Sequence, residues 1–142
     1  MRIALAFILL AWPAAAWEFA PSPICTLTET NVDGTLTITY DASLPEYTIT
    51  ITLPEATWPD APNFAMAFAG ERPIGIQTDR HRLSDDRRSL TVTDTGFGNV
   101  LNGLEFNLRA YATSGDMTVG FALTDIGTAI RDFRNCPADN IA

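Results

Sequence analysis

Apolar and polar residues alternate with a period of two along much of the chain, which is typical of β-strands with one buried face. In segments 35–41 and 46–53, apolar residues stand at 36, 38, 40, 47, 49, 51 and 53, with threonine at most positions between them. Threonine is itself β-branched, so propensity and pattern agree. They predict two strands whose threonines face water.

Turn signals divide the first half of the chain into separate strands. The sequence Asn31–Gly34 contains Asp-Gly, a strong hairpin signal, and residues 41–45 separate the next two strands. We therefore expect an antiparallel meander of three strands from residue 25 to residue 53. Pro54, Pro59 and Pro62 follow, and because proline cannot join a ladder, the chain should cross here to another edge or sheet.

Alternation resumes further along the chain and indicates a β-sandwich. It covers segments 64–68, 74–77 and 90–94, while the charged segment 79–88 between them is expected to form a solvated turn around Ser84, Asp85 and Asp86. Segments 106–112 and 117–123 predict a last hairpin around residues 114–116. The predicted fold class is mainly β, an antiparallel sandwich of about eight strands with a short C-terminal helix and one disulfide.

Two short helices are expected in the second half. Asn99 is a candidate cap for one turn that ends before Gly103, and Thr124 or Asp125 can cap a helix that stops at residues 135–137. The apolar stripe of this C-terminal helix consists of Ile126, Ala129, Ile130 and Phe133.

The first residues have the pattern of a secretory signal peptide. One positive residue, Arg2, precedes an uncharged run from Ile3 to Trp12 and the small triplet Ala14–Ala16. Glu18 interrupts the run too early for a membrane span. We expect a signal peptide over 1–16 and one domain over 17–142, located in the periplasm or secreted, with no membrane span after cleavage.

The two cysteines, Cys25 and Cys136, are predicted to form a disulfide. An even pair at the two ends of an exported domain favours a bridge over two unpaired buried thiols, which is the alternative. The bridge requires that the two Cα atoms lie within about 7 Å.

Charge excludes several function classes. The chain has 17 acidic and 9 basic residues, and losing Arg2 with the signal peptide makes the mature domain still more acidic. Such a surface repels phosphate backbones, so we expect no nucleic-acid partner. All basic residues are arginine, which removes Schiff-base chemistry and a phosphate loop of the Walker type. No cofactor is predicted.

His81 is the only histidine, and Asp79 stands close to it in the sequence. A histidine oriented by a carboxylate could act as a general base, but no nucleophile motif accompanies the pair. Arg80 and Arg82 would also compete with any cation for the nearby carboxylates. We therefore predict no catalytic residue and no metal site, and keep His81 and Asp79 as candidate binding residues in a solvated turn.

Trp58, beside Asp60 in the proline-rich loop, is the other candidate binding residue. Loops on a rigid sandwich often carry recognition, and exposed tryptophan is a common anchor of interfaces. The alternative is that Trp58 folds back and fills one end of the sandwich, since large aromatic side chains are mostly buried.

A set of short motifs runs along the chain, at 17–19, 23–27, 47–51, 58–62, 78–81, 89–94, 96–100 and 133–137. Together these motifs resemble a group of uncharacterised short exported proteins of Gram-negative alphaproteobacteria. Their members can carry an automatic excinuclease-subunit name, which does not fit a chain without a phosphate loop. Strands ending in a short helix before a final cysteine are also similar to invasion-associated locus B proteins. The resemblance implies export but no activity.

The expected function is that of an exported, non-catalytic binding or envelope-associated protein whose partner is another envelope or extracellular protein. Two alternatives stay open: a small hydrolase or metal-dependent enzyme built on His81 and Asp79, and a secreted inhibitor that uses its acidic surface against a basic enzyme such as lysozyme. The oligomeric state does not follow from the sequence.

Overall fold

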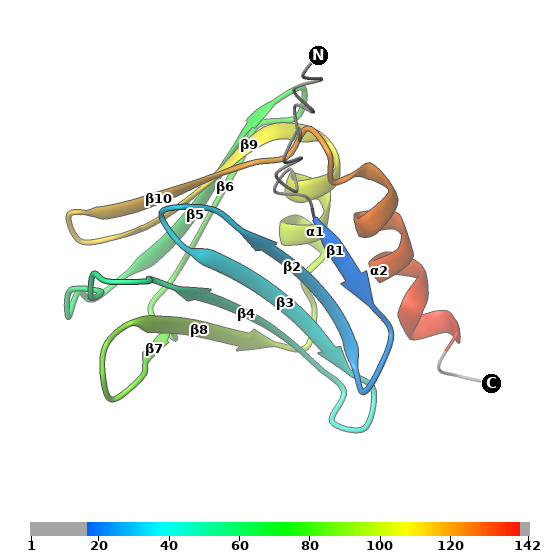
Figure 1. Ribbon diagram of the computed structural model, residues 1–142, viewed down its shortest axis with the longest axis horizontal. Helices are drawn as coiled ribbons and strands as arrows, with labels where there is room; N and C mark the ends of the chain where they lie inside the picture. Colours follow the sequence, from blue (N-terminus) through cyan, green and yellow to red (C-terminus); the bar gives the residue numbers. More distant parts are fainter. Residues whose placement is uncertain (1–16, 140–142) are drawn as a thin grey trace, which may run out of the picture.

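Residues 17–139, which the computed structural model describes, form two antiparallel β-sheets with two helices at one side (Figure 1). Sheet A has the strand order β1-β2-β3-β4-β8-β7, and sheet B has the order β10-β9-β5-β6. The predicted mainly β class is confirmed. The predicted signal peptide, residues 1–16, lies outside the described residues. The strands are β1 Glu18–Ala20, β2 Cys25–Thr30, β3 Thr35–Asp41, β4 Glu46–Thr52, β5 Phe64–Gly70, β6 Ile74–Thr78, β7 Arg82–Leu83, β8 Ser89–Asp94, β9 Asn107–Ser114 and β10 Met117–Ala122.

The meander of β2, β3 and β4 forms as the alternation predicts. Ile38 pairs with Leu27 on one side and Ile49 on the other, so that apolar residues stand next to each other on the inner face of sheet A. At the predicted hairpin, the Asn31 side-chain oxygen accepts hydrogen bonds from the backbone N–H groups of Asp33 and Gly34. The turn thereby fixes the register of the first two strands of the meander.

The proline-rich loop carries the chain from sheet A to sheet B, as predicted, and is fastened at Trp58. The Trp58 side chain is fully buried, and its indole N–H donates to the Ile51 carbonyl over 3.1 Å. The Trp58 backbone N–H donates to the Arg87 carbonyl over 2.7 Å. The first bond joins the loop to β4, and the second joins it to the turn between β7 and β8.

Both helices are longer than expected. Helix α1 spans Gly98–Glu105, so Asn99 lies inside its first turn and Gly103 inside the helix, where the sequence predicted a cap and an end. Gly103 is buried against the Phe68 ring, which explains a glycine at this position. Helix α2 spans Gly127–Asp139 and continues through Pro137. Proline within the last turn removes only one backbone donor, so it does not stop the helix at once.

The disulfide between Cys25 and Cys136 is confirmed, with a Cα–Cα distance of 6.1 Å. It joins β2 to α2 and closes a loop of 111 residues. Within residues 17–139, neither helix is long and apolar enough to cross a membrane.

Candidate functional site

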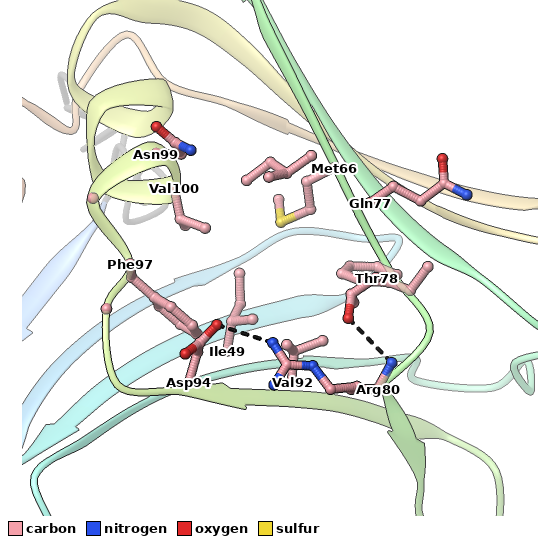
Figure 2. Close-up of a pocket in the computed structure, with 14 residues that line it drawn as sticks. Ile49, Met66, Gln77, Thr78, Arg80, Val92, Asp94, Phe97, Asn99 and Val100 are labelled. Carbon is pink, nitrogen blue, oxygen red and sulfur yellow. Dashed lines mark hydrogen bonds and ion pairs between the residues drawn. The ribbon is translucent and has the colours of Figure 1, made fainter.

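A pocket of about 440 Å³ opens between the two sheets, where β6 of sheet B stands across from β4 and β8 of sheet A (Figure 2). The start of α1 and the segment before it form a third wall. The lining residues are Ile49, Phe64, Met66, Ile76, Gln77, Thr78, Arg80, Val92, Asp94, Gly96, Phe97, Gly98, Asn99 and Val100.

The interior of the pocket is apolar because the strands turn their inward positions towards it. Ile49 and Val92 are directly paired across β4 and β8. Met66 and Ile76 are paired across β5 and β6 and also line the pocket. Met66 lies opposite Ile49 and Val92 (Figure 2). Val100 lies between the two sheets in the same view. The period-two pattern that builds the core therefore also builds the walls of the pocket.

The rim of the pocket is polar and carries one ion pair. The Nη2 atom of Arg80 and the Oδ2 atom of Asp94 lie 3.3 Å apart, and the two side chains are 72% and 40% exposed, respectively. The Arg80 backbone N–H donates to the Thr78 hydroxyl over 3.1 Å, which holds the arginine beside the end of β6. Exposed ion pairs contribute little to stability. Either charge can therefore exchange its partner for a ligand group at small cost.

The predicted binding residues Asp79, His81 and Asp60 do not form one site. Asp79 and Asp60 are exposed, and neither makes a hydrogen bond or ion pair within the part of the chain that the structure describes. The His81 Nε2 atom lies 3.1 Å from the Ala61 carbonyl oxygen, to which it donates when it carries the proton. The His81 Nδ1 atom is buried and has no hydrogen-bond partner among residues 17–139.

This geometry gives His81 a packing role. Its ring stands 6.3 Å from that of Phe64, and its hydrogen bond joins the segment after β6 to the loop before β5. A general base needs its free nitrogen within reach of a nucleophile or water. A metal site would need further ligands, and the described residues contain no group of three or more His, Cys, Asp or Glu side chains suited to a metal ion.

Trp58 belongs to the core, which was the alternative to an exposed anchor. Its ring meets Phe64 edge to face, with 6.5 Å between the ring centroids. The Trp58 ring therefore cannot serve as an exposed anchor, because no part of its side chain reaches the surface. Trp58 instead supports the pocket indirectly, since Phe64 also lines it.

Sequence reasoning missed the pocket because no motif marks it. Its residues come from five separate segments that only the packing of the two sheets brings together. The one local signal was the break at 96–98, where Gly96 and Gly98 flank Phe97 just before and at the start of α1. That break turns Phe97 inward, where it is buried.

Comparisons of the chain with protein-family models, with curated proteins and with solved structures gave no match.

Proposed function

We propose that the protein is an exported, non-catalytic binding protein that holds a small amphipathic ligand in the pocket between its sheets. The observation that carries the proposal is the pocket itself, which combines an apolar interior with a rim of a few polar groups. Small-molecule sites in proteins have this composition and a volume of about 300–1,000 Å³. An apolar tail would fill the space between Val92 and Ile76, and a polar head would meet Arg80 or Asp94.

Export is supported by two independent features. The first is the predicted signal peptide at residues 1–16. The second is the disulfide, because such bridges persist in oxidising compartments and are rare in the cytosol. Both fit the periplasm and the external medium equally. The resemblance to short exported proteins also implies export and stays a prediction.

The proposal is tested with three probes that share one chain and differ in head group: octanoate, 1-octanol and octylamine. Backbone amide shifts in NMR report where each probe binds. We expect shifts at Ile76, Val92 and Val100 with at least one probe. A preference for octanoate would assign the head group to Arg80, and a preference for octylamine would assign it to Asp94.

A pocket-filling variant provides the decisive comparison. Val100→Trp places a large side chain in the pocket, whereas Val32→Trp makes the same change in the β2–β3 turn, at a side chain that is 90% exposed. Binding should disappear in Val100→Trp and persist in Val32→Trp. Absence of shifts at the pocket with all three probes, or equal binding by both variants, would refute the proposal.

A further inference from the structure

The outer face of sheet A carries a regular array of hydroxyl side chains. β2, β3, β4 and β8 each contribute three of them, at alternate positions, and their cross-strand pairing places them in three rows of four. We call this surface the threonine grid. Its rows are Thr30-Thr35-Thr52-Ser89, Thr28-Thr37-Thr50-Thr91 and Thr26-Thr39-Thr48-Thr93.

Hydrogen bonds between neighbouring hydroxyl groups order the grid. The Thr50 and Thr91 hydroxyl oxygens lie 3.1 Å apart in the middle row. In the row that begins with Thr30, the hydroxyl oxygens of Thr30 and Thr35 are also 3.1 Å apart. A β-branched side chain on a strand has few rotamers, so these hydroxyl and methyl groups are held in repeated positions. The grid is therefore rigid as well as regular.

The grid is free of charge, although the chain is strongly acidic. All twelve positions are Thr or Ser, while charged residues stand only at its borders, with Glu18 beside Thr28, Arg82 beside Thr91, and the Asp41–Glu46 pair at one end. The alternate residues of the same strands point into the core, as Leu36 and Ile51 do. The grid side chains are half-buried against one another or exposed.

Strand propensity alone does not explain this composition. Sheet B is also antiparallel and also has one face turned away from the core, and this outer face carries one threonine pair, Thr113 with Thr118, beside unlike residues. Tyr111 stands opposite Gly120, and Ala67 stands opposite Tyr111. A stable outer face in this fold thus tolerates a mixture of side chains. We infer from the uniform side-chain composition of the grid that its partner also has a uniform surface.

The spacing of the grid defines that partner. Neighbouring strands are about 4.8 Å apart, and alternate residues along a strand are roughly 6.8 Å apart. A matching surface must be uncharged, rich in hydrogen-bonding oxygen, and periodic in two dimensions on this scale. The surface of an ice crystal meets all three conditions, since the repeats of hexagonal ice lie close to both spacings. Its neutrality also matches the absence of charged side chains from the twelve positions of the grid.

We propose that the threonine grid is an ice-binding surface. The hydroxyl groups hydrogen-bond to water molecules of the crystal surface, and the methyl groups between them exclude mobile water. Right-handed twist rotates each strand against the next, so the match to a flat crystal is best over β3 and β4. Thr50 lies in the middle row of β4 and is thus the most sensitive position. The proposal does not depend on a ligand in the pocket.

The test measures adsorption to ice directly. Purified protein is partitioned into a slowly growing polycrystalline ice hemisphere, and ice recrystallisation is followed in the same solutions by microscopy. We expect the natural chain to be enriched in the ice and to keep crystals small. Thr50→Lys should lose both effects, because it puts a long charged side chain into the centre of the grid.

The matched control is Thr118→Lys, which makes the same change at the threonine pair on sheet B. It should behave as the natural chain does. If Thr50→Lys does not fold, as judged by circular dichroism, Thr50→Val replaces it. Valine keeps the shape and removes one hydroxyl, so enrichment in the ice should fall measurably.

Each of the following outcomes would overturn the proposal: the natural chain is not enriched in ice, Thr50→Lys and Thr118→Lys adsorb equally, or the protein binds powdered crystalline cellulose but not ice. Sedimentation on the same samples shows whether the grid pairs two copies instead. Self-association that Thr50→Lys abolishes, without ice enrichment of the natural chain, would also overturn it.

Discussion

Glu29 illustrates how a single polar residue is accommodated inside this fold. It shares the inner face of β2 with Cys25 and Leu27 and is only 7% exposed. Burial raises the pKa of the Glu29 carboxyl above its ordinary value, and the negative charges of Asp125 and Glu18 act in the same direction. The folded protein therefore holds this proton more tightly than the unfolded chain does.

The raised pKa of Glu29 makes stability depend on pH in a definite direction. Well below pH 4.5, the ordinary pKa, the carboxyl is neutral in both states and its raised pKa has no effect on stability. As the pH rises through the folded pKa, ionisation destabilises the folded state. Glu29→Gln should therefore raise the melting temperature at neutral pH, and this gain should vanish below pH 4.5.

Thermal melts of Glu29→Gln at several pH values check this expectation. Glu55→Gln, an exposed change in the β4–β5 loop, serves as the control and should shift the melting temperature little. A gain for Glu29→Gln that is equal at acidic and neutral pH would contradict the electrostatic explanation.

The burial of the Trp58 ring could not be predicted from this residue and its neighbours in the sequence. The sequence placed it correctly in a crossing loop, and left open whether its ring faces water or the core. What decides the matter is its indole N–H, which donates to the Ile51 carbonyl at the end of β4. That acceptor becomes available only once the loop folds back, so no local pattern could reveal it.

At the scale of elements, the contact between α1 and β5 depends on the absence of a side chain at Gly103. A Cβ atom there would lie 2.4 Å from Cδ2 of Phe68, whose ring is only 2% exposed. Glycine ordinarily costs a helix about 1 kcal/mol relative to alanine. Close packing therefore overrides helix propensity, which also explains why Gly103 did not end the helix as expected.

Gly103→Ala should destabilise the protein by about 1–3 kcal/mol, because the added methyl group has no room in a packed core. Gly98→Ala, in the same helix, should not destabilise it, since nothing lies within 4 Å of the corresponding Cβ position. Urea unfolding of both variants measures the difference. Equal effects on the free energy of unfolding would show that Phe68 does not restrict this position.

Strands were more predictable than helix ends, for a physical reason. A strand of seven residues such as β3 displays its alternation in its own sequence. β1 and β7 have three and two residues, too few to show any period, and they form because a neighbouring strand offers its free edge. Helix ends likewise depend on contacts from elsewhere, such as the ion pair of Arg134 on α2 with Glu105 on α1.

At the scale of the whole molecule, the sequence predicted the β-sandwich but did not predict the pocket. Alternation states which residues face inward, but not how far apart two sheets will stand at one edge. Val92 and Ile76 looked like ordinary core positions, and only the arrangement of the sheets leaves space between them. The candidate site could therefore not be predicted from residue types.

The disulfide acts at this scale because it closes nearly the whole domain. Replacing both Cys25 and Cys136 by alanine should lower the free energy of unfolding by about 2–4 kcal/mol, mainly by enlarging the ensemble of unfolded conformations. Urea unfolding measures the loss, and the natural chain under reducing conditions should show a similar value. An unchanged unfolding midpoint in the double variant would contradict this role.

The same bridge sets how the protein responds to mechanical tension. When the two ends of the domain are pulled apart, the force runs along β1, passes from β2 to α2 through the sulfur–sulfur bond and bypasses the strands inside the loop. The chain between the two cysteines, which are 111 positions apart in the sequence, could otherwise extend by up to roughly 370–400 Å and stays folded under load. Only reduction of the bond would expose them to stretching, so the redox state of the surroundings decides whether the domain is extensible.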